Sequence, residues 1–229
     1  MRVKAKVVCF DADQTLIDLR SALLEALRNA LLRIQGLGYG AETLTVQRLV
    51  DDRDAAAAAM GARASMEEIR LEGFRRSLAP LGATAEVIQR VTEGFLADRF
   101  RLARPYDDVV PALDALHRRY RLGLATNGNS YPDRVGLAHF FEFTVYAHVC
   151  GFRKPDPAFF AAVCEAARRE PAEIVYVGDS PVEDIAGARG AGLNAVWINR
   201  DGVSDAPTQA AEPQITSLLE LQEHLDSFG

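Results

Sequence analysis

Apolar residues along this chain follow two patterns, one typical of buried strands and the other typical of helices. The run Lys6–Phe10 is short, apolar and contains two valines, and carboxylates follow it, so it predicts a first, buried strand. From Ile17 to Gln35, apolar residues recur at helical spacing. Between about Glu42 and Arg101 the pattern stays helical, with breaks expected at Gly61 and Gly82. This part of the chain therefore predicts one strand followed by a long helical segment.

After Pro105 the pattern changes to strands that alternate with helices. The predicted strands are Tyr120–Ala125, Thr144–Val149, Ile174–Val177 and Ala195–Ile198. The predicted helices are Val109–Arg119, Pro132–Phe140, one that Asp156 and Pro157 would open as N-cap and first residue, Pro181–Arg189, and Ser217–Leu225. Residues 201–213 are polar and contain two prolines, which predicts a loop.

This order of elements predicts an α/β fold. Strands that alternate with helices form right-handed crossovers, and hence a Rossmann-like, doubly wound parallel sheet with helices on both faces. Because the helical segment interrupts that pattern, we expect an α/β core domain of residues 1–16 and 103–229 and an inserted α-helical cap domain of residues 17–102.

Four clusters of polar side chains come just after predicted strands. Ligands of parallel α/β sheets bind outside the carboxyl ends of the strands, so these side chains are expected to lie at one edge. In chain order they are a carboxylate pair, a hydroxyl with an amide, a lysine, and a second carboxylate pair. The corresponding segments are Asp11-Ala12-Asp13-Gln14-Thr15, Thr126-Asn127-Gly128, Lys154-Pro155, and Gly178-Asp179-Ser180 with Glu183-Asp184.

Such a set of side chains suits the chemistry of a phosphoryl group. Neighbouring carboxylates repel unless a cation compensates them, and oxygen ligands without a histidine cluster favour a hard ion such as Mg²⁺. Asp11, Asp13 and Asp179 would supply that site. Lys154 and Thr126 would neutralise and hydrogen-bond an anionic group beside the metal. Phosphate uses both kinds of contact, so the hypothesis is a phosphoryl-transfer site.

Charge and composition narrow the range of partners. The chain has 26 Lys and Arg against 32 Asp and Glu, a formal charge of −6, whereas recognition of a nucleic acid polymer normally needs a basic patch. The apolar run before Asp11 is too short for a signal peptide or a membrane anchor, so we expect a cytoplasmic protein without a membrane partner. Cys9, Cys150 and Cys164 form no CxxC pair, so reduced cysteines are expected.

The four clusters together resemble the motifs of the haloacid dehalogenase (HAD) superfamily, in the subgroup whose helical cap is inserted after the first motif and which includes phosphoglycolate phosphatase-like and nucleotidase-like enzymes. The first motif of that family, DxDx[TV], is matched by the segment from Asp11 to Thr15. The second is matched by Thr126, the third by Lys154, and the fourth by Gly178-Asp179-Ser180 with Asp184. Each motif alone is weak, but all four in order over nearly the whole chain are specific.

The resemblance implies a Mg²⁺-dependent phosphatase that hydrolyses a small phosphomonoester through an aspartyl-phosphate intermediate. Asp11 would be the nucleophile, and Asp13 would protonate the leaving oxygen and later accept a proton from the attacking water. Mg²⁺ would be bound by Asp11, the backbone carbonyl of Asp13, and Asp179, with Asp184 either a direct ligand or close behind the ligands. The phosphoryl oxygens would be bound by Thr126, Asn127 and Lys154.

More than one function is compatible with these residues. A 2-haloacid dehalogenase also uses a nucleophilic aspartate but needs no metal, and relatives of that kind generally lack the second aspartate of the first motif, so Asp13 favours a phosphatase. A phosphomutase, or a binding protein that has kept the fold without catalysis, would carry the same motifs. Gln14 stands where many relatives have glycine, and its side chain could tune substrate access.

The sequence leaves the identity of the substrate open. In capped relatives the insertion closes over the site, so residues 17–101 should set specificity. Four arginines of this segment could bind an acidic leaving group or could be solvated helix charges: Arg20, Arg53, Arg63 and Arg99. Phosphoglycolate-like acids, sugar phosphates and nucleoside monophosphates all fit, and the oligomeric state is not predicted.

Overall fold

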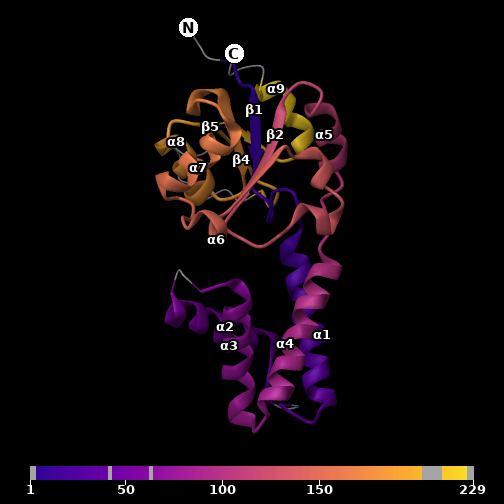
Figure 1. Cartoon of the computed structure of the whole chain (residues 1–229). Helices are drawn as coiled ribbons and strands as arrows, with labels where there is room; N and C mark the ends of the chain where they lie inside the picture. Colours follow the sequence, from indigo (N-terminus) through magenta and orange to yellow (C-terminus); the bar gives the residue numbers. More distant parts are fainter. Residues whose placement is uncertain (1–3, 41–42, 62–63, 203–212, 226–229) are drawn as a thin grey trace. The chain divides into compact units, whose positions relative to one another are not determined.

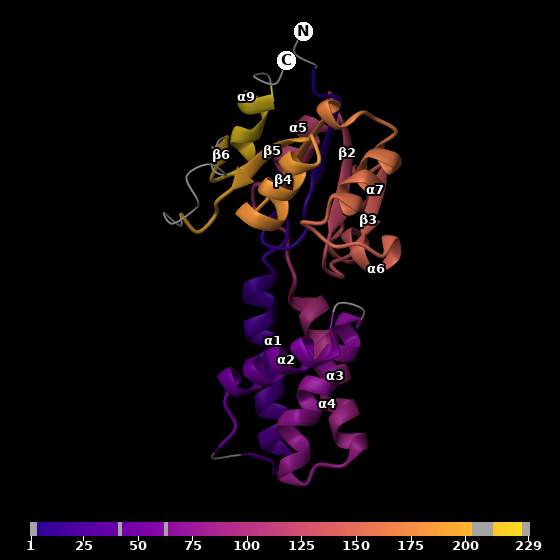
Figure 2. The same cartoon turned by 90° about the vertical axis from the view of Figure 1, so that its left-hand side faces the viewer.

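A computed structural model describes residues 4–40, 43–61, 64–202 and 213–225 of the chain. The chain forms two compact units, Met1–Asp18 with Pro105–Gly229, and Leu19–Arg104 (Figure 1 and Figure 2). The first contains the strands and is called the sheet unit here, and the second is the helical unit. Within the described ranges, every helix is too short or too polar to cross a lipid bilayer.

The sheet unit contains a six-stranded sheet in which every pair of neighbouring strands is parallel. The strand order is β3-β2-β1-β4-β5-β6. In the central strand β1, Phe10 pairs with Leu124 of β2 and with Val177 of β4, so the carboxyl ends of these three strands lie side by side. This topology confirms the predicted Rossmann-like α/β fold. The strands are β1 (Val7–Phe10), β2 (Arg121–Thr126), β3 (Phe143–Tyr146), β4 (Ile174–Gly178), β5 (Asn194–Ile198) and β6 (Gln214–Ile215).

Helices cover both faces of this sheet, which explains the continuous apolar runs of its central strands. Helices α7 (Pro157–Ala167) and α8 (Gly187–Gly190) lie on one side, and α5 (Val109–Leu116) and α9 (Leu221–Leu225) lie on the other (Figure 1). All four residues of β1 are completely buried. Helix α7 begins as predicted: Asp156 Oδ1 accepts a hydrogen bond of 2.8 Å from the N–H of Ala158, and Pro157 is the first helical residue.

Two predicted elements of the sheet unit are wrong in type. Pro132–Phe140 is not one helix but two short 3₁₀ turns, η2 (Pro132–Val135) and η3 (Ala138–Phe140), because Gly136 adopts a φ of 76° and ends the first turn. The predicted strand Thr144–Val149 ends at Tyr146, and Ala147–Cys150 forms the short helix α6. Hydrophobic periodicity alone cannot distinguish a short buried strand from a helical turn, which accounts for the second error.

Other differences concern the ends and lengths of elements. The predicted helix Val109–Arg119 stops at Leu116. The predicted helix Pro181–Arg189 consists of a π-helical turn, η5 (Pro181–Ala186), followed directly by α8. The predicted helix Ser217–Leu225 begins as the 3₁₀ turn η6 (Leu218–Glu220). The two-residue strand β6 was not predicted because so short a run has no readable alternation. Most of the predicted loop 201–213 lies outside the described residues.

In its described residues, the helical unit has four α-helices around a core of its own. They are α1 (Leu19–Gly36), α2 (Val46–Met60), α3 (Met66–Leu78) and α4 (Ala85–Leu102). Hydroxyl side chains cap the N-termini of α2, α3 and α4, and Gly61 and Gly82 have φ values of 75° and 81° at the predicted breaks. Phe74 and Phe95 pack edge to face with their ring centroids 5.4 Å apart. Arg63 lies outside the described residues.

Candidate active site

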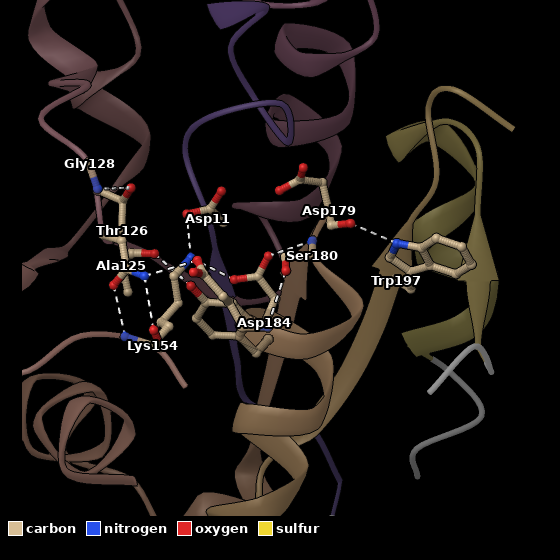
Figure 3. Close-up of polar contacts among 12 residues, drawn as sticks. Asp11, Ala125, Thr126, Gly128, Lys154, Asp179, Ser180, Asp184 and Trp197 are labelled. Atoms are coloured by element: carbon tan, nitrogen blue, oxygen red, sulfur yellow. Dashed lines mark hydrogen bonds and ion pairs between the residues drawn. The ribbon is translucent and has the colours of Figure 1, made fainter. Parts of the chain in front are cut away.

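A buried lysine bridges two carboxylates at the carboxyl end of the sheet. Asp11 follows β1 directly, and its backbone N–H donates a hydrogen bond of 2.8 Å to the carbonyl oxygen of Val177. The Nζ atom of Lys154 lies 2.6 Å from Asp11 Oδ1 and 2.6 Å from Asp184 Oδ1 (Figure 3). All three side chains are at most 6% exposed, so these charges interact out of contact with bulk water.

A third carboxylate completes the cluster. Carboxylate oxygens of Asp11, Asp179 and Asp184 all lie within 4.8 Å of one another. Asp179 follows β4, and its backbone carbonyl accepts a hydrogen bond of 2.8 Å from the indole N–H of Trp197 (Figure 3). The N–H of Ser180 donates to Asp184 Oδ2 at 2.9 Å, so the π-helical turn η5 holds Asp184 against the strand end.

Two glycines make room for the carboxylates of the site. A Cβ atom on Gly178 would collide with the side chain of Asp184, and one on Gly128 would collide with Asp13 Oδ2. Asp13 therefore lies directly against the loop that follows β2. Thr126, the last residue of β2, is buried, and its Oγ1 accepts a hydrogen bond of 3.0 Å from the N–H of Gly128 in that loop (Figure 3).

The carboxylates outnumber the cations in this buried cluster, and the pKa values respond to that imbalance. Burial raises the pKa of Asp11 well above its usual range against the opposing effect of Lys154. Burial, and then the charge of Asp184, raise the pKa of Asp179 to about 7. Burial by itself lowers the pKa of Lys154, but the carboxylates of Asp11 and Asp184 outweigh it and raise that pKa, so the ammonium stays protonated.

A hard divalent cation fits this donor set. Each of the three clustered carboxylates offers oxygen, the ligand atom that Mg²⁺ prefers, and their charges exceed the single charge of Lys154. A bound dication would compensate the remaining negative charge, which is the condition for several carboxylates to be ionised in one buried site.

The side chain of Asn127 is hydrogen-bonded to the backbone of Lys154. Its side-chain oxygen accepts a hydrogen bond of 2.8 Å from the N–H of Lys154, and its Nδ2 donates to the carbonyl of Lys154 at 3.1 Å and to Glu183 Oε2 at 3.0 Å. The amide is thus occupied with fixing the backbone of Lys154. The predicted contact of Asn127 with a phosphoryl group stays a prediction.

Sequence reasoning overlooked Tyr176, one of the residues around the lysine. Tyr176 is completely buried in β4, its hydroxyl donates to the carbonyl of Ala125 at 2.6 Å, and Lys154 Nζ lies 5.5 Å from its ring centroid. In the sequence this tyrosine is one more large residue in a strand pattern. Glu183, from the fourth polar segment, accepts the hydrogen bond from Asn127.

The backbone explains the unusual residue of the first motif. Gln14 has a φ of 60°, in the left-handed region where glycine is favoured, so the glycine of many relatives is the residue that this turn accommodates best. A non-glycine residue adopts this conformation at a cost of about 1 kcal/mol.

Comparisons with known proteins agree with this geometry. Residues 5–192 match the family model described as haloacid dehalogenase-like hydrolase. A glyceraldehyde 3-phosphate phosphatase of Methanopyrus kandleri is 32% identical over 212 residues, which are 87% of this chain and 86% of that protein. A phosphoserine phosphatase of Thermus thermophilus is 33% identical over 155 residues, 65% of this chain, which spans only 61% of that relative.

A solved structure extends the likeness to the whole fold. The crystal structure of a 2-haloacid dehalogenase from Pseudomonas syringae pv. Tomato DC3000 matches with a TM-score of 0.80 at 30% sequence identity, over 98% of this chain and 100% of that one. The family model spans most of the chain, and the residues of the four sequence motifs lie at one edge of a parallel sheet. The protein therefore belongs to the haloacid dehalogenase-like hydrolases.

Proposed function

We propose that this hydrolase is a Mg²⁺-dependent phosphatase that cleaves a small phosphomonoester through an aspartyl-phosphate intermediate on Asp11. The observation that carries the proposal is the pair of carboxylates on one turn: Asp11 contacts Lys154, whereas Asp13 lies against the loop that follows β2. A nucleophile and a separate acid–base group are what two-step phosphate ester hydrolysis needs. The phosphatases that this chain resembles at 32% and 33% identity support the same choice.

The residues would divide the chemistry as follows. A carboxylate oxygen of Asp11 bonds to phosphorus while the ester P–O bond breaks, and Asp13 gives its proton to the leaving alcohol oxygen. Water then attacks the phosphorus of the aspartyl phosphate, its proton passes to Asp13, and the carboxylate of Asp11 is released with inorganic phosphate. The protonated amine of Lys154, which contacts Asp11, and the hydroxyl of Thr126 would bind the phosphoryl oxygens, where negative charge is spread in the transition state.

Asp11, Asp179 and the backbone carbonyl of Asp13 would hold Mg²⁺, with Asp184 in the same cluster of carboxylates. When bound, the ion supplies positive charge that offsets the charge of the carboxylates and of the phosphoryl group. Asp184 accepts hydrogen bonds from Lys154 and from Ser180, so it also fixes the amine that faces Asp11.

Mg²⁺ should stabilise the folded chain even without substrate. In a thermal unfolding scan, saturating MgCl₂ is expected to raise Tm by roughly 5 °C relative to EDTA, because the ion binds only the folded cluster. Asp179→Asn should lose most of this rise. The control is Asp114→Asn, the same substitution at an exposed residue of α5, which should keep it. An equal rise in Asp179→Asn and in the wild type would place the ion elsewhere.

The function itself is tested with a panel of phosphorylated metabolites, assayed in Mg²⁺ and in EDTA. We expect release of inorganic phosphate that depends on Mg²⁺. Halide release from a 2-haloacid in EDTA, without phosphate release from any ester, would identify a dehalogenase instead. Conversion of one sugar phosphate into its isomer without free phosphate would identify a phosphomutase.

Gly128→Ala should impair catalysis more than stability. The added methyl group would collide with Asp13 Oδ2 and push the acid–base carboxylate away from its position. A displacement of about 1 Å is expected to lower kcat by about 10²-fold, with a small change in Tm. The matched control is Gly190→Ala, where a Cβ would meet no atom within 4 Å. A wild-type kcat in Gly128→Ala would contradict the role of Asp13.

A further inference from the structure

Three arginines of the helical unit lie on neighbouring helices, and two of them, Arg70 and Arg99, are buried, whereas the side chain of Arg53 is 31% exposed. They are Arg53 of α2, Arg70 of α3 and Arg99 of α4, helices that Figure 2 shows grouped together. Arg70 is 7% exposed and Arg99 is 6% exposed, whereas Arg20 of α1 is exposed. Arg99 is therefore not a solvated helix charge, one of the two interpretations that the sequence left open for it, and Arg70, which the sequence analysis did not single out, is buried too. A buried guanidinium costs folding free energy unless an anion compensates it.

Contacts among these helices bring the arginines together. Helix α3 approaches α2 so closely at Gly73 that an added Cβ would lie 3.0 Å from the Cα of Arg53, and Arg70 is one turn before Gly73. The guanidinium carbon of Arg70 lies 5.2 Å from the ring centroid of Phe95 in α4, and Arg99 is one turn after Phe95. The charges of Arg53 and Arg99 both act on Arg70.

The described residues give Arg70 no anionic partner and give Arg53 a single, exposed one. Among the described residues, Arg70 has no hydrogen bond and no ion pair; its partner is the face of the Phe95 ring. The Nε atom of Arg53 is buried and makes no hydrogen bond, although it lies 2.9 Å from Oδ1 of the exposed Asp54. Nearby Asp98 is already bound by Arg33 at 2.6 Å and by Arg101 at 2.9 Å.

The electrostatics of Arg70 agree with a missing anion. Burial, and then the positive charges of Arg53 and Arg99, lower the pKa of Arg70 to about 9, and Asp54 only partly opposes them. The guanidinium is still protonated at pH 7. Contact with the face of the Phe95 ring attracts the cation, but this attraction is smaller than the desolvation penalty of a buried ion.

We propose that the junction of α2, α3 and α4 binds a small oxyanion, a carboxylate or a phosphate group, through the guanidinium groups of Arg70 and Arg53, with Arg99 adding positive charge. The planar fork of N–H donors on arginine matches the paired oxygens of both groups. This site lies within the helical unit and does not depend on the proposed phosphatase activity. The bound carboxylate or phosphate group could come from two sources: a second anionic group of the substrate, or a separate metabolite.

Arginine Nε–Hε resonances test anion binding at this place in the full chain. Sulfate serves as the probe for phosphate and malonate as the probe for carboxylate, with chloride at equal ionic strength as the reference. We expect the signals of Arg70 and Arg53, assigned with Arg70→Met and Arg53→Met, to move in a saturable way with one of the two probes. Signals that respond no differently from those in chloride would overturn the proposal.

Thermal unfolding separates an anion site from a structural arginine. Without sulfate or malonate, Arg70→Met should unfold about 3 °C above the wild type, because an uncompensated buried charge is removed. Adding the anion should then raise Tm less in Arg70→Met than in the wild type. Arg90→Met, at an exposed arginine of α4, is the control for general effects of salt and should respond as the wild type does. A lower Tm for Arg70→Met with an unchanged anion response would show a structural role and overturn the proposal.

Kinetics then distinguish the two sources of the anion. For Arg70→Met, the KM of a phosphomonoester with a carboxylate in its alcohol part is compared with the KM of one with an uncharged alcohol part. A ratio of these KM values that rises about tenfold over the wild type identifies the substrate as the source. An unchanged ratio together with a lost sulfate or malonate response identifies a separate anion. The arginine resonances and Tm report anion binding without turnover. If no anion binds, the proposed phosphatase function is not contradicted. If the protein has no phosphatase activity, the resonances and Tm still test anion binding.

Discussion

Asp11→Asn is expected to lower kcat for phosphomonoester hydrolysis by at least about 10⁴-fold, the scale of losing a catalytic nucleophile. The amide that replaces the carboxylate has nearly the same size but cannot form an acyl phosphate. It also leaves Lys154 with one carboxylate contact, to Asp184, in place of two. The measurement is steady-state phosphate release with Mg²⁺, together with KM, on the ester that the substrate panel identifies.

A trapping experiment makes this prediction specific to the covalent route. Rapid acid quench of the wild type during turnover should yield a peptide that contains residue 11 and carries one phosphoryl group, and Asp11→Asn should yield none. Asp114→Asn, at an exposed position of α5, serves as the matched control and should retain both turnover and the labelled peptide. Phosphate release by Asp11→Asn at the wild-type rate would exclude Asp11 as the nucleophile.

Lys154→Met should be the most damaging substitution for stability, with a loss of about 3–5 kcal/mol in the free energy of unfolding. The amine of Lys154 is 3% exposed and lies 2.6 Å from both Asp11 and Asp184, so its removal leaves two buried carboxylates without their cation. The methionine fills a similar volume, which separates the loss of charge from the loss of packing. The measurement is equilibrium unfolding in urea at neutral pH.

The control for this prediction is the same substitution at an exposed lysine. Lys6 pairs with Glu173 at 2.6 Å, but its side chain is 54% exposed, and exposed ion pairs contribute about 0–1 kcal/mol. Lys6→Met should therefore change the free energy of unfolding little. If Lys154→Met and Lys6→Met were equally mild, the bridging role of the buried amine would be refuted.

The elements that the sequence predicted well are those whose local signals agree with their tertiary environment. The run that became β1 is apolar throughout because it is the central strand, buried on both faces. Asp156 and Pro157 begin α7, since capping and a fixed φ are local properties of the chain. The breaks at Gly61 and Gly82 were also readable, because glycine adopts positive φ without strain.

Elements were mistaken where local signals were weak or balanced. The apolar stretch after Thr144 fits a strand and a helical turn equally well, and only its packing placed the change at Ala147. Gly136 divides a segment that periodicity alone would join into one helix. Strand β6 exists because Trp197 and Ile198 of β5 offer it partners, a long-range condition that a two-residue run does not record.

The candidate site shows the same division between local and long-range information. The order of its motifs along the chain indicated the family, and the rule that parallel strands end at one edge indicated that Asp11, Lys154 and Asp179 would meet. The roles of other residues depend on distances between segments far apart in the sequence. Asn127 binds the backbone of Lys154, 27 positions away, and Tyr176 lies beneath the lysine from a third segment.

By itself, the sequence determined the α/β class, the long helical segment after the first strand, the family and the residue types of the site, because periodicity, caps and motifs are written in short stretches of chain. Only the tertiary structure decided which charges have partners. Lys154 pairs with two carboxylates, whereas Arg70 pairs with no carboxylate among the described residues. No sequence pattern predicts this difference between the two basic residues. The physical reason is that the free energy of a buried charge depends on neighbours in space, which are brought together only when the chain folds.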